Sequence, residues 1–135
     1  MIRKENRFDE YSYRVASLPL DLTVDRVEEG QWVTIKNGKV VIAGAEDVKA
    51  FLVIGSKREG RDQVSGKAVC KVSFLVGDFM LTVSNFDTSK SYTTDMTPLK
   101  VAEGGILEPG TQGTDKIVAY AIGQPNAGFL RIVSA

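Results

Sequence analysis

After Gly30 the chain consists of short apolar runs, some of which alternate with polar residues, and these runs are separated by turn-forming residues. A repeat of two residues is typical of strands, because successive side chains of a strand point to opposite faces of the sheet. The clearest hairpin surrounds Asn37 and Gly38, since these residues suit the two positive-φ positions of a type I′ turn. The pattern predicts about nine strands, at residues 20–24, 31–35, 39–42, 48–54, 69–76, 79–84, 98–101, 116–122 and 129–133.

Polar segments between these strands mark the loops, and the longest are residues 56–66, 85–97 and 109–115. Residues 56–66 are long for a hairpin connection, so this segment is predicted to be a mobile or binding loop. No stretch has the period of a helix of normal length. Short strands at regular spacing predict an all-β fold. We expect a single small β-barrel domain over residues 15–135, with a sandwich as the alternative architecture.

The N-terminal segment, residues 1–14, has neither a strand period nor a helix period. Its basic and aromatic residues are Arg3, Lys4, Arg7, Phe8, Tyr11, Tyr13 and Arg14. Terminal segments are often disordered, and a disordered tail is one interpretation. Aromatic side chains beside arginine are also favoured in protein interfaces, because they bury a large area at a low cost in entropy. The second interpretation is therefore an extended arm that becomes ordered on a partner, with those basic and aromatic residues as the partner-binding site.

The composition limits the chemistry that the chain can perform. Its 135 residues include no histidine, the side chain best suited to proton transfer near neutral pH. The 17 basic and 17 acidic residues give a formal net charge of zero, so no global positive field attracts nucleic acid. The single cysteine, Cys70, cannot form an intramolecular disulfide, and its strand-like surroundings favour a small apolar role over a reactive thiol. No apolar run is long enough for a transmembrane helix, and no signal-peptide pattern follows the N-terminus, so we expect the protein to remain where it is made.

Each candidate motif for catalysis or ligand binding has a simpler structural explanation. Residues 60–68 resemble a phosphate-binding loop, but five residues separate its glycines instead of four, and Ala68 stands where a hydroxyl is needed. The carboxylates lie at predicted turns, which favour aspartate for backbone hydrogen bonding. The serines and threonines of residues 88–94 would need a lysine base, and no strand-to-helix elbow supports one. We therefore expect no enzyme, no metal site and no cofactor, with two carboxylates that converge as an acid/base pair as one alternative.

The order of glycines and strands from Gly30 to Ala135 is similar to that of a known family. The matching segments are residues 30–38, 53–55, 77–79, 97–101, 104–107, 116–122 and 128–132. This arrangement resembles the small head-decoration, or capsid cement, proteins of tailed bacteriophages. It is a pattern of strands and glycines and contains no enzyme signature.

The resemblance implies a β-barrel or β-tulip body and an N-terminal arm that lies along the major capsid protein. It implies a structural virion protein on the outside of the phage capsid, made in the host cytoplasm and assembled as a homotrimer at threefold or quasi-threefold points. The implied partner is the major capsid protein, with no nucleic acid and no membrane. Many weak contacts repeated around a shell would give strong attachment.

Two other functions stay open: another virion component, such as a tail-tube or fibre-base protein, and a β-barrel carbohydrate-binding module. Trp32 and Tyr92 distinguish the last of these. If both rings lie on one exposed face, they favour a sugar-binding module. If both are buried, and the arm is ordered or bound to a partner, they favour the capsid role.

Overall fold

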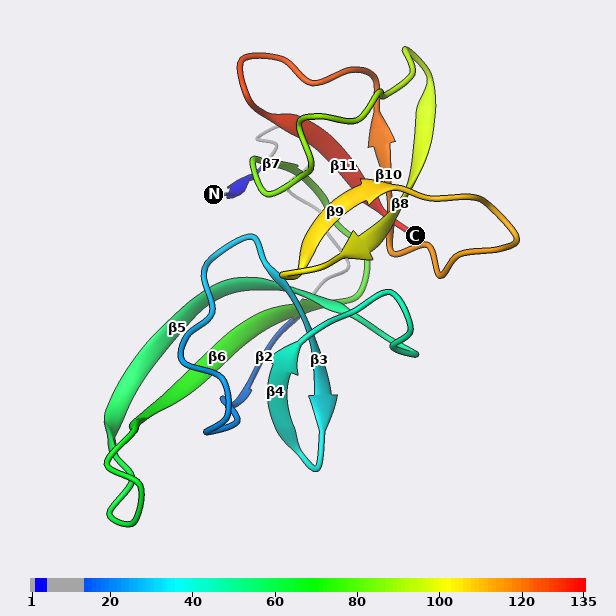
Figure 1. The fold of residues 1–135 in the computed structure, drawn as a ribbon. Helices are drawn as coiled ribbons and strands as arrows, with labels where there is room; N and C mark the ends of the chain where they lie inside the picture. Colours follow the sequence, from blue (N-terminus) through cyan, green and yellow to red (C-terminus); the bar gives the residue numbers. More distant parts are fainter. Residues whose placement is uncertain (1, 5–13) are drawn as a thin grey trace.

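The structure is a computed structural model that describes residues 2–4 and 14–135. These residues contain eleven strands and no helix, which confirms the all-β prediction. The strands are β1 (Ile2–Lys4), β2 (Arg14–Pro19), β3 (Trp32–Lys36), β4 (Lys39–Ile42), β5 (Phe51–Arg61), β6 (Ala68–Val76), β7 (Met80–Val83), β8 (Met96–Ala102), β9 (Ile106–Pro109), β10 (Ala119–Ile122) and β11 (Leu130–Ser134). They form one five-stranded and one six-stranded antiparallel sheet, which lie one beyond the other along the molecule (Figure 1).

The five-stranded sheet has the order β2-β6-β5-β3-β4. One parallel bridge, between Leu20 after β2 and Val40 in β4, brings its two outer strands together. The sheet therefore curls around its own apolar core. The buried members of this core are Leu20, Val27, Val33, Val40, Val53, Val72 and Phe74.

The six-stranded sheet has the order β1-β7-β11-β10-β8-β9. A parallel bridge between Phe86, which follows β7, and Leu107 in β9 curls this sheet in the same way. If β1 is left out, five strands remain, and their order is the same as in the other sheet. When the strands of each sheet are numbered along the chain, the first pairs with the fifth, the fifth with the fourth, the fourth with the second and the second with the third. The chain thus builds one arrangement twice, in a first unit of residues 14–76 and a second unit of residues 80–134.

The two units also share the turn that follows their first strand. One carboxylate oxygen of Asp21 accepts hydrogen bonds from the amide and the hydroxyl of Thr23, at 2.9 and 2.7 Å. Asp87 accepts the same pair of bonds from Ser89, at 2.9 and 2.6 Å. The backbone amide of each aspartate donates to the carbonyl of the residue at its closing bridge, at 2.9 and 2.8 Å. The repeat therefore extends from strand order to individual hydrogen bonds.

Trp32 joins the two units. It belongs to β3, but it is buried in the core of the six-stranded sheet, where its ring centroid lies 6.3 Å from that of Phe79. Its amide donates to the carbonyl of Gly105 at 2.8 Å. Gly105 has a φ of 75°, and a Cβ there would lie 2.7 Å from the Trp32 carbonyl oxygen. Only glycine fits this contact between the sheets without a shift of the backbone.

The structure confirms the predicted hairpin at Asn37 and Gly38, whose φ angles are 53° and 74°. The predicted loop at residues 56–66 is wrong, because β5 continues to Arg61. The predicted strand at residues 20–24 is also wrong, since β2 ends before Leu20 and the chain turns at Asp21. In each sheet a single bridge joins the two sides that curl toward each other. The described residues therefore form two curled sheets, and neither sheet is closed into a barrel by a continuous ladder of backbone hydrogen bonds.

Candidate functional site

The predicted partner-binding residues are divided between two strands and the part of the chain that lies outside the described residues. Arg3 and Lys4 belong to β1, which pairs with β7 at the edge of the six-stranded sheet. Arg14 is the exposed first residue of β2 in the other sheet. The remaining predicted residues, Arg7, Phe8, Tyr11 and Tyr13, lie outside the described residues. The two ends of the predicted arm are therefore fixed on different sheets.

A short ladder attaches β1 to its own chain. Ile2 pairs with Val83 and packs, partly buried, against the core of the six-stranded sheet. The backbone nitrogen of Ile2 donates to Oε1 of Glu29 at 2.7 Å, which connects β1 to the segment that leads into β3. The first residues of the predicted arm thus make contacts within the chain.

One exposed feature of the described structure is the outer part of the β5–β6 hairpin, defined here as the ribbon, residues 56–71, which β2 meets only at its inner end. The ribbon projects beyond the five-stranded sheet (Figure 1). Every residue of β5 from Ser56 to Arg61 is exposed. At the tip, Asp62 accepts hydrogen bonds from two backbone amides of the turn, at 3.2 and 2.7 Å, and Val64 is 98% exposed. The segment that resembles a phosphate-binding loop is therefore a capped hairpin turn.

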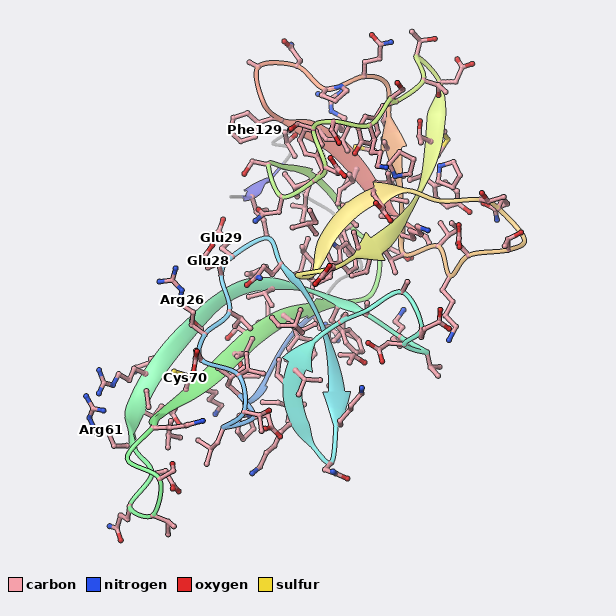
Figure 2. All side chains as sticks on the ribbon, viewed as in Figure 1. Arg26, Glu28, Glu29, Arg61, Cys70 and Phe129 are labelled. Carbon is pink, nitrogen blue, oxygen red and sulfur yellow. The ribbon has the colours of Figure 1, made fainter. Side chains whose placement is uncertain are left out.

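The ribbon is basic although the chain is neutral. Five basic residues stand against two acidic ones, which gives the ribbon a formal charge of +3 and leaves −3 on the other residues. Arg61, near the far end (Figure 2), donates to a carbonyl of the turn at 3.0 Å, and Lys67 donates to the carbonyl of Leu22 at 3.1 Å. The other three basic residues form no ion pair with another described residue, and they are Lys57, Arg58 and Lys71.

Three aspartates hydrogen-bond to their own turns, as the sequence predicts. The backbone amides of Thr23 and Ser65 lower the pKa of Asp21 and Asp62. The hydroxyl of Ser89 lowers the pKa of Asp87. These carboxylates are held ionised by local hydrogen bonds, which suits a structural role at turns better than proton transfer near neutral pH. Among the described residues, no group of three His, Cys, Asp or Glu side chains could hold a metal ion.

The two aromatic residues that would distinguish a sugar site are both buried, with Trp32 2% exposed and Tyr92 6% exposed. The ring of Tyr92 lies edge-on to Phe86, with 5.6 Å between centroids, and its hydroxyl donates to the carbonyl of Asp87 at 2.9 Å. Burial raises the pKa of Tyr92 to about 12. Neither ring is available as a stacking platform for a ligand.

A cavity of about 330 Å³ lies beside Trp32 at the junction of the two units. Apolar side chains such as Leu52, Leu75 and Phe79 form part of its wall, together with charged residues of both signs. The indole nitrogen of Trp32 is buried and has no hydrogen-bond acceptor among the described residues. Cys70 lies elsewhere, half-buried against the core of the first unit (Figure 2), in agreement with the small apolar role that the sequence predicts.

The sequence analysis predicted residues 56–66 as a mobile or binding loop but missed that they belong to a paired ribbon, and it also missed the repeat. A signal for the repeat is present: an apolar residue, aspartate, any residue and then a hydroxyl residue, at residues 20–23 and again at 86–89. A signal for the ribbon is the run of basic residues on either side of Gly60 and Gly66, between two strands that pair with each other. Each of these two sequence signals consists of only a few residues.

Comparison of the chain with protein-family models, with curated proteins and with solved structures finds no match. No helix in the described residues is long and apolar enough to cross a membrane.

Proposed function

We propose that the protein is a structural component of a tailed-bacteriophage head, which binds the outside of the capsid lattice and stabilises it. The proposal comes from the resemblance of residues 30–135 to head-decoration proteins. Its partner is the major capsid protein, and the protein acts as a homotrimer on the virion surface. It carries out no catalysis and needs no cofactor.

The burial of Trp32 and Tyr92 is the observation that most favours this role over a carbohydrate-binding module. Sugar-binding surfaces need exposed aromatic rings, because a pyranose ring packs on the face of the aromatic side chain. Here both rings fill the interior, and the exposed features are strand edges and a basic ribbon. Such features suit protein contacts, since an exposed strand edge offers unpaired backbone groups to a neighbour.

Stabilisation of a shell requires no catalytic group. A protein that binds only the assembled lattice shifts the equilibrium toward that lattice by mass action. A trimer contacts the lattice at several points, so modest individual contacts combine into strong attachment. A tail-tube or fibre-base protein would be attached by the same kind of repeated contacts, but to a different partner. Whether the protein binds capsids or tails decides between the two roles.

The test is co-sedimentation of the full chain with capsids that lack it, and with isolated tails. A variant with Arg7→Ala, Phe8→Ala, Tyr11→Ala and Tyr13→Ala changes the predicted partner-binding residues and leaves β1 in place. We expect this variant to keep its Tm and to lose roughly tenfold or more in capsid affinity, because aromatic and arginine side chains dominate protein interfaces. A control with Lys39→Ala and Lys90→Ala, both exposed and elsewhere, should bind normally.

Three results separate the alternatives. Binding to tails but not to capsids would replace the decoration role with the tail role. Normal capsid binding by the four-residue variant would remove the arm from the interface. A monomer at every concentration in sedimentation velocity would restrict trimer formation to the lattice.

A further inference from the structure

We propose that the ribbon, residues 56–71, is a docking surface for a carboxylate-rich surface of a partner protein. Four observations support it: the extra length of the ribbon, the pairing of two lysines, the open face beside them and the composition of the ribbon. The proposal goes beyond the capsid role and does not depend on it, because it concerns the chemistry of the partner surface and not the particle that carries it.

The length of the ribbon exceeds what the fold needs. β5 and β6 have 11 and 9 residues, whereas their counterparts in the second unit, β10 and β11, have 4 and 5. The short pair completes the same strand order around a larger core. Only the inner end of the ribbon is supported by the rest of the unit, since Pro19 of β2 pairs with Lys71 and Cys70 packs half-buried against the core. Beyond this inner end, the extension of β5 and β6 adds an exposed surface that the core does not require.

Two lysines face each other on the ribbon. Lys57 of β5 lies directly opposite Lys71 of β6 in the antiparallel register, so their side chains share one face. Like charges directly opposite each other destabilise a sheet. Both side chains are exposed, and neither forms an ion pair with another described residue. This arrangement becomes favourable when carboxylates of a partner lie between or beside the two ammonium groups.

The face that carries the lysines is open. Gly55 lies two residues before Lys57 on the same strand, and a Cβ there would meet nothing within 4 Å. Ser73 is opposite Gly55 in β6, and its hydroxyl is 2.8 Å from that of Ser17 in β2. Small side chains across three strands therefore leave room for a partner, and the one hydroxyl proton that the serine pair does not use internally can be donated to a carboxylate.

The composition of the ribbon favours carboxylates over phosphates. Residues 56–71 contain no aromatic side chain on which a base could stack, and stacking contributes much of the affinity for single strands. They also include Glu59 and Asp62, which would repel the continuous negative charge of a nucleic acid. A protein surface can place its carboxylates against the lysine pair and keep away from these two residues. Mixed charges of this kind give specificity at protein interfaces.

The test uses the full chain and dye-labelled poly-L-glutamate as a model of a carboxylate-rich surface, with fluorescence anisotropy as the measurement. We expect saturable binding that weakens with added salt, and a loss of roughly tenfold in affinity for the variant with Lys57→Gln and Lys71→Gln. The matched control is Lys49→Gln with Lys90→Gln, which removes the same charge from exposed positions outside the ribbon and should bind like the wild type. Absence of wild-type binding, or equal losses in both variants, would overturn the proposal.

A second variant separates binding from folding. Lys71→Glu places a glutamate opposite Lys57, so it should raise the Tm by converting a repulsive pair into an attractive one. The same change should abolish binding to poly-L-glutamate. A higher Tm with unchanged binding would show that the lysines are not part of a docking surface. Tighter binding of a single-stranded oligonucleotide of equal charge, with the same dependence on Lys57 and Lys71, would overturn the protein partner in favour of nucleic acid.

Discussion

The two units share a strand order, a closing bridge and an aspartate turn, and they differ in what is added to that frame. The second unit carries β1 on the free edge of its first strand, β7. In the first unit, the described residues place no strand on the corresponding edge of β2 beyond the single bridge of Leu20 to Val40. Conversely, the first unit extends its last two strands into the ribbon, and the second does not. The shared frame is what the core requires, and the additions mark surfaces that serve another purpose.

The cores differ as clearly as the additions. Five of the seven buried residues in the core of the first unit are valines. The core of the second unit is larger and contains leucine, isoleucine and aromatic side chains, among them Trp32, Leu52 and Leu75 contributed by strands of the first unit. The first unit therefore buries part of its apolar surface in its neighbour. We infer that the two units unfold together, because the core of the second unit is incomplete without Trp32, Leu52 and Leu75 of the first unit.

The largest expected effect comes from a cavity in the larger core. Leu130→Ala removes a fully buried side chain of the second unit and should lower the free energy of unfolding by about 4 kcal/mol. Val53→Ala in the smaller core should lower it by about 2 kcal/mol, since fewer atoms are removed. Urea unfolding followed by the fluorescence of Trp32, the single tryptophan, and by far-UV circular dichroism measures both. Coincident transitions are expected in each variant. Separate transitions for the two probes would mean that the units fold independently.

The next effect concerns the contact between the units. Gly105→Ala places a Cβ 2.7 Å from the carbonyl oxygen of Trp32 and should cost about 3 kcal/mol, from the clash together with the strain at positive φ. Gly104→Ala is the matched control: its φ of 83° imposes a similar strain, but a Cβ there meets nothing within 4 Å. We expect the control to lose only about 1 kcal/mol. Equal losses in thermal unfolding would show that the contact at Trp32 contributes nothing beyond backbone strain.

The sequence predicts strands where the apolar pattern and the turn chemistry agree. It fails at residues 20–24, which alternate but form a turn, and at residues 56–61, which have no apolar period but form a strand. Around Asn37 and Gly38 the alternation and the turn chemistry agree, and the hairpin lies where it is expected. In β5 the residues from Ser56 on are exposed on both faces, so no apolar period marks them as strand. Polar strands of this kind depend on pairing with another strand, here the next strand β6, and the hydrophobic pattern of the segment itself does not reveal that pairing.

The candidate surfaces are predicted less well than the fold. Arg3, Lys4 and Arg14 are the predicted partner-binding residues that the described structure contains, and they lie on two different sheets. The pairing of Lys57 with Lys71 could not be predicted, because two β-bulges set the register between β5 and β6. The repeated aspartate turn was readable in principle, as an apolar residue and an aspartate before a hydroxyl two residues on. The motif indicates an internal repeat only once both copies are known to follow equivalent strands.

The smallest expected effect tests whether the two aspartate turns are energetically equivalent. Asp21 and Asp87 have pKa values below 3.8, the value of an unperturbed aspartate, because their carboxylates accept hydrogen bonds from Thr23 and Ser89. A carboxyl whose pKa is lowered by folding stabilises the folded state above the unfolded pKa, and this contribution disappears as the pH falls through the folded pKa. The Tm should therefore decrease as the pH is lowered from neutral to below the pKa of these groups. Asp21→Asn and Asp87→Asn keep an acceptor oxygen without the charge. In each variant the Tm should therefore fall slightly less between neutral and low pH than in the wild type, by a similar amount in both. Calorimetry across this pH range measures the difference. A larger change for Asp87→Asn would show that the two turns share their geometry but not their energetics.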